Sequence, residues 1–282
     1  MEPKSPNILQ SDVPLNTLEA HYAEYFASPR QLEWYEVSAI DKSRNIMTMT
    51  ARVPHKSVLD VGAGNGSVLH RLDDADFGDR LCAAEISASG LKEIRSKSWK
   101  HLEDVQAFDG YALPFATQSF DLVVLSHVIE HVEHPRLLLR EAARVGRHVY
   151  IEVPLEYRRT NRRLWKPFQI DATGHINFYN PTLIRLLVES AGLRVIDQQV
   201  LHYIPEVYTF WKGKRGLLNY WIKHIAFLFS RRLASIVFNY HCGLLCAAAS
   251  MEPMNSSAHP NRAPSGESSG RRSKATTSSS PT

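Results

Sequence analysis

The chain has 282 residues, of which 44% are hydrophobic and 22% charged, and its formal net charge is +4. These values are typical of a soluble globular protein with one good-sized core, and such a small positive charge does not favour binding of nucleic acid. Three cysteines lack the spacing of a metal site or a disulfide framework, so we expect a cytoplasmic protein. The first six residues lack the apolar stretch of a signal peptide, and no apolar run reaches the roughly 18–20 residues of a membrane span.

The two ends of the sequence are polar. Residues 1–14 predict a flexible arm, and residues 250–282, rich in Ser, Pro, Thr and Gly, predict a disordered tail. Residues 15–52 predict an N-terminal cap of two helices, the second starting with a capping box at 28–31. This cap either covers a cofactor or only packs against a sheet, and the sequence leaves both open. We expect the main domain at residues 53–249.

A glycine-rich turn organises that domain. Residues 58–66 read VLDVGAGNG, a short apolar strand followed by three alternate glycines, and a helical pattern starts at Ser67. A turn of this kind presents backbone N–H groups at a helix N-terminus to a ligand. A dinucleotide motif requires glycine where Ser67 stands, so a diphosphate ligand is disfavoured.

The following strands end in polar residues. A second strand is predicted at 80–87, and its Glu85 comes about 20 residues after the last glycine, where a carboxylate can accept both ribose hydroxyls. A third strand at 105–110 carries Asp109, and further strands are predicted at 119–126 and 146–154. Parallel strands end at the same edge of a sheet, so we expect these side chains to share one site.

The second half of the domain continues with helices and strands. Asn180-Pro181 predicts the start of a helix that ends before Gly192, and residues 193–197 begin a sixth strand. Residues 217–229 form a further apolar segment, and residues 235–249 predict a last, reversed strand.

The glycine turn after Asp60, the acids at 85 and 109 and the segment HVIEHVEHP at 127–135 together resemble class I S-adenosylmethionine-dependent methyltransferases of the ubiquinone/menaquinone-biosynthesis (methyltransferase type 11) group. The resemblance covers roughly residues 56–192. It implies a Rossmann-like, doubly wound α/β fold with a seven-stranded sheet whose last strand is antiparallel, and S-adenosylmethionine as cofactor. The cofactor-binding residues that it implies are Asp60, Gly62, Ala63, Gly64, Gly66, Glu85, Ile86, Asp109, Gly110 and Ser126.

Methyl transfer is the activity that the resemblance implies, and we expect O-methylation of a small-molecule or lipid-linked acceptor. A hydroxyl acceptor needs a base with a pKa near neutrality, which favours histidine. The candidates are His127, His131 and His175, although His131 and His175 could instead hold loops by hydrogen bonds. In some relatives a carboxylate at position 127 completes a metal site. Its replacement by histidine leads us to expect no metal, although His127, Glu130 and His131 could still bind one.

A basic insertion is predicted at residues 155–179. We expect Arg158, Arg162 and Asn177 to bind an anionic substrate; a solvated loop and contact with a membrane surface are the alternatives. A monomer and a homodimer both remain open. Two rival functions also remain, a nicotinamide-dependent oxidoreductase, which Ser67 and Asp109 disfavour, and a non-catalytic protein that binds S-adenosylmethionine.

Overall fold

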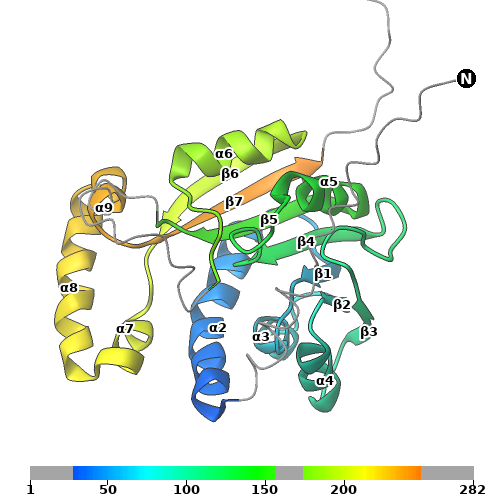
Figure 1. Cartoon of the computed structure of the whole chain (residues 1–282), viewed down its shortest axis with the longest axis horizontal. Coiled ribbons are helices and arrows are strands. Elements are labelled where there is room, and N and C mark those ends of the chain that lie inside the picture. Colours follow the sequence, from blue (N-terminus) through cyan, green and yellow to red (C-terminus); the bar gives the residue numbers. More distant parts are fainter. Residues whose placement is uncertain (1–27, 157–173, 249–282) are drawn as a thin grey trace, which may run out of the picture. The chain divides into compact units, whose positions relative to one another are not determined.

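The computed structural model describes residues 28–156 and 174–248 (Figure 1). The chain divides into two units, residues 1–249 and 250–282, and every described residue belongs to the first. The expected arm, tail and first helix, and most of the basic insertion, lie outside the described residues, so the predicted division of the chain stays a prediction.

A seven-stranded sheet forms the centre of the first unit, in the order β3-β2-β1-β4-β5-β7-β6. Its strands are β1 (Ser57–Val61), β2 (Arg80–Glu85), β3 (Leu102–Ala107), β4 (Phe120–Ser126), β5 (Gly146–Pro154), β6 (Leu193–Leu201) and β7 (His241–Ala248). β7 lies between β5 and β6 and is antiparallel to both. The sheet is the Rossmann-like, doubly wound arrangement that the resemblance predicts.

Helices cover both faces of this sheet. They are α2 (Pro29–Thr50), α3 (Ser67–Asp74), α4 (Ala88–Ser96), α5 (Pro135–Val145), α6 (Pro181–Ser190), α7 (Pro205–Lys212), α8 (Lys214–Phe229) and α9 (Arg231–Val237). Figure 1 shows α2, α3 and α4 on one side of the sheet and α5 and α6 on the other. The chain changes side between β1 and β4, and ligands of open α/β sheets bind at such a switch point.

Alternating side chains of the central strands build two apolar cores. On β1, Leu59 and Val61 belong to the core under α5 and α6, whereas Val58 belongs to the core under α2, α3 and α4. Both faces of β1 are therefore buried, which explains why it reads as a continuous apolar run rather than an alternating one. The rigid sheet fixes the positions of the strand ends that form the site.

Local sequence signals were correct at some helix ends and wrong at others. The side chain of Asn180 accepts hydrogen bonds from the first turn of α6, as predicted. Ser28 makes no such bond, so the predicted capping box is wrong and α2 starts at Pro29 without it. β3 begins at Leu102, earlier than expected. The last strand begins at 241 rather than 235, because Ser230 caps a further helix, α9, over part of the predicted range.

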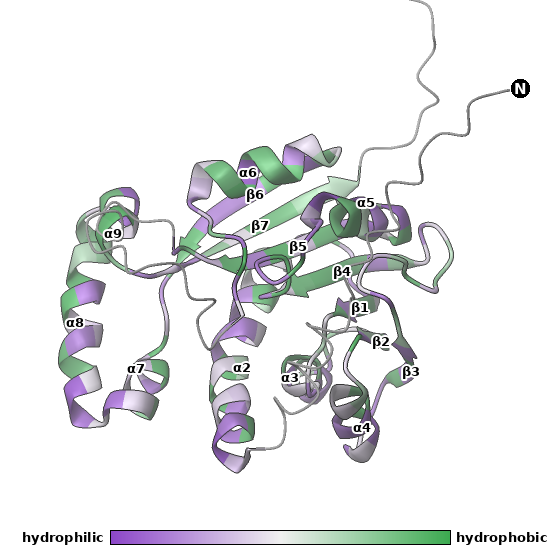
Figure 2. Cartoon of the chain, in the orientation of Figure 1, coloured by the Kyte–Doolittle hydropathy of each residue, from purple (hydrophilic) through white to green (hydrophobic). Residues whose placement is uncertain are grey.

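Three helices, α7 to α9, connect β6 to β7, where the sequence predicted only an apolar segment. Figure 2 shows apolar residues along much of α8 and α9. In the described part of the chain, no helix combines the length and the hydropathy needed to cross a membrane.

Candidate active site

The glycine turn after β1 adopts a conformation that requires glycine. Gly62 and Gly64 have φ values of +70° and +60°, in the left-handed region. A Cβ atom on Gly62 would lie 2.8 Å from Cγ2 of Val128, so glycine also allows the close approach of the segment after β4. Gly66, with φ +77°, is the N-cap residue of α3 and packs against Ile94 rather than facing the pocket.

Glu85 connects the end of β2 to this turn. Its carboxylate accepts a hydrogen bond from the N–H of Gly64 at 2.7 Å and another from the N–H of Ser87 at 2.9 Å. Burial raises the pKa of Glu85 above its ordinary value. Because two backbone donors fix its position, the carboxylate is held at the edge of the pocket, where each oxygen keeps a lone pair for a ligand hydroxyl.

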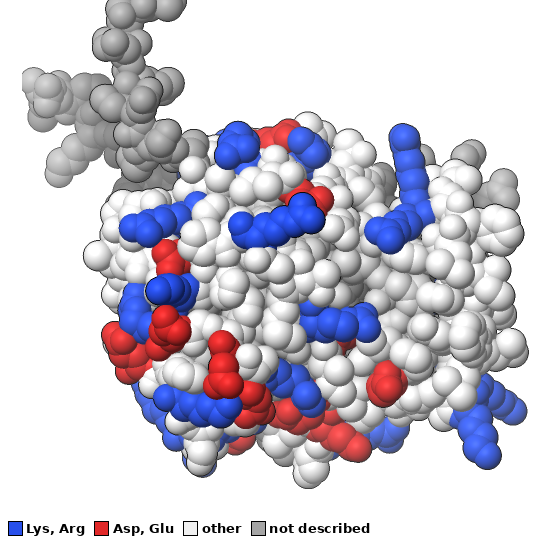
Figure 3. Space-filling model, turned by 180° about the vertical axis from the view of Figure 1, so that it is seen from behind, with Lys and Arg blue, Asp and Glu red and all other residues white. Residues whose placement is uncertain are grey.

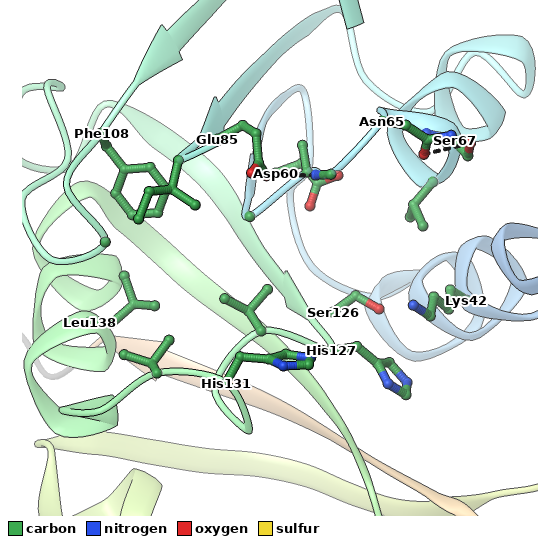
Figure 4. Close-up of a pocket in the computed structure, with 18 of the residues that line it drawn as sticks. Lys42, Asp60, Asn65, Ser67, Glu85, Phe108, Ser126, His127, His131 and Leu138 are labelled. Carbon is green, nitrogen blue, oxygen red and sulfur yellow. Dashed lines mark hydrogen bonds between the residues drawn. The ribbon is translucent and has the colours of Figure 1, made fainter. Parts of the chain in front are cut away.

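Asp60 and Lys42 supply the charges at the centre of the site. Asp60, at the end of β1, is 3% exposed, and burial together with the nearby Glu85 raises its pKa to about 7. Lys42 extends from α2 toward Ser126 (Figure 4). Burial lowers its pKa, although nearby carboxylates, Glu152 and Asp60 among them, oppose that effect. The pocket therefore holds a buried acid, Asp60, and a half-buried base, Lys42.

Lys42 is a site residue that the sequence analysis missed. Tyr35, Ser38 and Lys42 all line the pocket, and their spacing of three and four residues places them on one face of α2. This polar spacing could have identified the pocket-facing side of the helix. The apolar residues of the same helix instead indicated only the side that packs. The last turns of α2, with Ile46 and Met49, pack against the sheet, so α2 both lines the pocket and packs.

A pocket at the ends of β1, β2 and β4 brings most predicted site residues together (Figure 4). Figure 4 shows Asp60 and Glu85 on one side, His127 and His131 on the other, and Phe108 and Leu138 at one end. The predicted residues that line it are Asp60, Gly62, Ala63, Gly64, Glu85, Ile86, Asp109, Gly110, Ser126, His127 and His131. Gly66, His175 and Asn177 are not among its lining residues. Arg158 and Arg162 lie outside the described residues.

Asp109 and Asn177 both make hydrogen bonds that shape loops. One carboxylate oxygen of Asp109 accepts the N–H groups of Tyr111 and Ala112 at 2.8 and 2.7 Å, which fixes the loop after β3. The side-chain amide of Asn177 donates to the carbonyl oxygens of Ile129 and Val132 at 3.2 and 2.7 Å. Asn177 thus holds the loop that carries His131, a role different from the predicted contact with substrate.

His131 faces the pocket from this loop. Its Nδ1 lies 3.2 Å from the carbonyl oxygen of Gly174, so Nδ1 carries the proton and Nε2 is the acceptor nitrogen. Burial lowers the pKa of His131, so the ring is neutral at pH 7. The ring of His175 lies edge-on at 4.7 Å, and its Nδ1 is 2.7 Å from the carboxylate of Glu156. His175 therefore contacts the ring of His131 without lining the pocket, and its own partner is the carboxylate of Glu156.

His127 lies between two fully buried carboxylates. Its backbone has a φ of +59°, a strained value for a residue other than glycine, and its N–H donates to the carbonyl oxygen of Glu152. Its ring nitrogens lie 3.2 Å from Glu130 and 3.6 Å from Glu152. Burial alone would raise the pKa of Glu130, but His127 lowers it to about 2. Such strained, charged arrangements cluster at functional sites.

Glu152 is also the centre of a hydrogen-bond network that the sequence did not reveal. The hydroxyl of Tyr150 donates to it at 2.6 Å, the amide of Asn45 at 3.3 Å, and His241 at 2.5 Å from the start of β7. Burial, together with the nearby His127, lowers the pKa of His241 to about 4, so its ring is neutral at pH 7. The partners come from α2, β5 and β7, and no local pattern connects them.

Among the residues that the structure describes, two groups of side chains have a geometry that could hold a metal ion. They are His127 with Glu152 and His241, and Glu130 with His131 and His175, each with ligand atoms within 4.8 Å of one another. In the first group, three protein donors already satisfy Glu152. In the second group Glu130 offers one carboxylate oxygen, and neither of its oxygens accepts a hydrogen bond of regular geometry from the described residues, although His127 lies close by. The expectation of no metal was argued from residue 127 and its neighbours alone. These two groups also include His241 and His175, which lie far from residue 127 in the sequence.

Comparison with known proteins gives consistent results. A family model described as a methyltransferase domain matches residues 26–198, more than half of the chain. A demethylmenaquinone methyltransferase of Renibacterium salmoninarum is 29% identical over 182 residues, which are 64% of this chain and 70% of the relative. A ubiquinone biosynthesis O-methyltransferase of Aeromonas salmonicida is 26% identical over 211 residues, 70% of this chain and 83% of the relative.

Solved structures share the fold. The structure of a magnesium protoporphyrin IX methyltransferase from Synechocystis PCC 6803 with bound SAH has a TM-score of 0.55 at 12% identity. The match covers 84% of this chain and 100% of that one. At this identity the likeness shows the fold alone.

Proposed function

Because the chain belongs to the methyltransferase domain family, and is thus an S-adenosylmethionine-dependent methyltransferase, we propose that it O-methylates a small-molecule or lipid-linked acceptor with His131 as general base. The family membership sets aside the oxidoreductase that the sequence left open.

The pocket residues fit S-adenosylmethionine. The Gly62 and Gly64 turn allows a ligand to approach the backbone closely, and the anchored carboxylate of Glu85 suits the two hydroxyls of a ribose. The buried carboxylate of Asp60 suits a cationic group, and Lys42 suits a carboxylate. Asp109, Ile86 and the ring of Phe108 would hold the adenine. These assignments follow from the chemistry of the side chains that line the pocket.

The cofactor supplies a methyl group that its sulfonium sulfur already activates. The protein therefore has three tasks, which are to align the acceptor, exclude water and remove the acceptor proton. The apolar side chains of Val128, Val132 and Leu138 line the pocket beside His131, and such an apolar wall favours the exclusion of water once cofactor and acceptor are bound.

His131 is suited to the third task. It is neutral at pH 7, and the bond from Nδ1 to Gly174 leaves Nε2 as the nitrogen that accepts a proton from the acceptor hydroxyl. The His175 ring, paired with Glu156, packs against it and keeps its orientation. The single observation that carries the proposal is the position of His131, whose ring is held by Gly174 and His175 at the pocket wall opposite Asp60 and Glu85.

The test is methyl transfer from labelled S-adenosylmethionine to a panel of hydroxylated acceptors and to cell extract, with products identified by mass spectrometry. We expect a methoxy product, and we expect His131→Asn to lower kcat by about 10²–10⁴ without changing S-adenosylhomocysteine affinity. His148 lies near the start of β5, away from the edge of the sheet that carries the pocket. His148→Asn is therefore the matched control and should leave both values unchanged. An N-methylated product, or an unaffected His131→Asn rate, would refute the proposed chemistry. Cofactor binding with no labelled product would indicate a binding protein.

Binding of the acceptor is the role that we propose for the basic insertion. We retain the prediction that Arg158 and Arg162 contact an anionic group of the substrate. Arg158→Ala with Arg162→Ala should raise KM for the acceptor and leave cofactor affinity unchanged, and unaltered kinetics would end this part of the proposal.

A further inference from the structure

Exposed apolar side chains concentrate on the helices between β6 and β7. Among the described residues, eleven of the sixteen large apolar side chains that are exposed lie on α7, α8 and α9. On α8, Leu218 is 67% exposed, Leu228 70% and Phe229 87%. A soluble protein normally scatters such residues, and a contiguous group of them marks an interaction site.

The exposed residues of α8 follow the helical repeat. Leu218, Trp221, Ile222, Ile225, Leu228 and Phe229 are separated by three or four residues, or adjacent, and so form one stripe along the helix. We call this stripe, together with Leu233, Ile236 and Val237 of α9, the α8–α9 face.

The opposite side of α8 already holds the helix to the protein. The rings of Tyr220, His224 and Phe227 lie 5.1 to 5.4 Å from the ring of His202, which follows β6. A Cβ atom on Gly216 would lie 2.2 Å from the carbonyl oxygen of Tyr208, so glycine lets α8 start close against α7. The fold therefore does not need the outward residues of α8 to be apolar.

Positive charge surrounds the α8–α9 face. Residues 205–237 contain six Lys and Arg residues and a single acid, Glu206. Lys212, Lys214 and Arg215 are exposed before or at the start of α8, and Arg231 and Arg232 are exposed after its end. Figure 3 turns this side of the molecule to the right, where the outer edge shows basic and uncharged residues, whereas acidic residues gather farther left and below.

We propose that the α8–α9 face docks on an anionic lipid bilayer. Apolar side chains that point away from the protein, with cations at both ends, are the composition of helices that lie in the membrane interface. α8 has 16 residues, which is about 24 Å, and one of its sides is packed on the protein. It therefore lies along the bilayer surface, with Trp221 at the level of the headgroups. A second copy of the chain fits less well, because a twofold contact would bring the same cations together.

The docking helices connect to the active site through α7. The ring of Trp34 on α2 lies 5.4 Å from Phe210 and 5.5 Å from Trp211, both on α7. The same helix α2 carries Tyr35, Ser38 and Lys42 into the pocket. α7 thus connects the docking helices to a wall of the pocket, and a site held beside the bilayer would favour a lipid-linked acceptor. This membrane docking goes beyond the proposed function, and it can be measured without cofactor or acceptor.

The test is sedimentation of the full chain with vesicles of phosphatidylcholine, with and without phosphatidylglycerol. We expect binding to the anionic vesicles that falls as salt is added, and much weaker binding to phosphatidylcholine alone. Leu218→Ser with Leu228→Ser should weaken it by about tenfold or more. Leu183→Ser with Leu186→Ser, two exposed leucines on α6, is the matched control and should bind like the wild type. Arg231→Gln with Arg232→Gln should weaken binding by about fivefold per charge.

A second measurement locates the contact. Brominated lipids should quench tryptophan fluorescence in the wild type, and Trp221→Phe should remove most of this quenching. No sedimentation with anionic vesicles would overturn the proposal. Full binding by Leu218→Ser with Leu228→Ser at an unchanged thermal midpoint would also overturn it. A dimer mass in light scattering that this variant returns to a monomer would assign the face to a second copy instead.

Discussion

Replacing Asp60 by asparagine should stabilise the cofactor-free protein and weaken cofactor binding at the same time. Burial and Glu85 raise the pKa of Asp60 from 3.8 to about 7, so the fold prefers the protonated form. A carboxyl group of this kind costs stability as the pH rises between its unfolded and folded pKa values, because the folded state then binds more protons than the unfolded one. The cost is absent below about pH 4 and complete above about pH 7.

The two pKa values set the size of the effect. Their difference of about three corresponds to about 4 kcal/mol at pH 8, which is an upper limit because an asparagine amide needs a hydrogen-bond partner of its own. We expect Asp60→Asn to raise the free energy of unfolding by about 2 kcal/mol at pH 8, with the gain shrinking as the pH falls toward 4. The same variant should bind S-adenosylmethionine at least about tenfold more weakly, since a cationic ligand loses its anionic partner.

Urea unfolding at a series of pH values measures the first effect, and titration calorimetry measures the second. Asp79→Asn removes an exposed carboxylate just before β2 and serves as control; it should change neither quantity by more than a few tenths of a kcal/mol. A loss of stability at pH 8 in Asp60→Asn, or unchanged affinity for S-adenosylmethionine, would refute this account of Asp60.

Three further predictions follow from the same geometry. Glu85→Gln should weaken S-adenosylhomocysteine binding by about tenfold or more in calorimetry, because the charged acceptor for the ribose hydroxyls is lost; equal affinity would show that the carboxylate only holds the turn. Gly62→Ala should lower the free energy of unfolding in urea by about 1–3 kcal/mol and should also lower cofactor affinity. Gly192→Ala is the control, because a Cβ atom there meets nothing within 4 Å; it should lower stability only by the backbone strain and leave cofactor affinity unchanged. Glu130→Gln should destabilise the protein by about 3–5 kcal/mol at pH 7 and by less as the pH falls from about 4.5 toward 2, because a carboxylate of lowered pKa stabilises the fold only while it is ionised. A constant difference across that range would contradict the lowered pKa of Glu130.

Sequence alone located the parts of the site that local chain geometry determines. The strand, the glycine turn and the helix N-terminus are contiguous, and the acids at 85 and 109 end or follow strands that an apolar run identifies. A parallel sheet then places these ends along one edge, so their proximity needed no knowledge of packing. The resemblance that these residues carry implied the seven-stranded fold.

Long-range packing determined what the sequence did not reveal. Lys42 reaches the pocket because of how α2 packs, and its position in the helix is informative only once that orientation is known. Glu152 and His241 are 89 residues apart and meet because β7 pairs with β5. Hydropathy identified an apolar segment at 217–229, but it could not show that one side of α8 is covered and the other is exposed.

The position of β7 has a consequence for biosynthesis. The strand lies between β5 and β6, and it is the only neighbour of β6 in the sheet of described strands. During translation, a nascent chain that ends before residue 241 therefore leaves one edge of β5 open and leaves β6 without any partner strand. Five of the seven strands, from β3 to β5 in the sheet order, can pair as soon as they are synthesised, whereas β6 waits for the last strand, and in that interval the chain is exposed to aggregation.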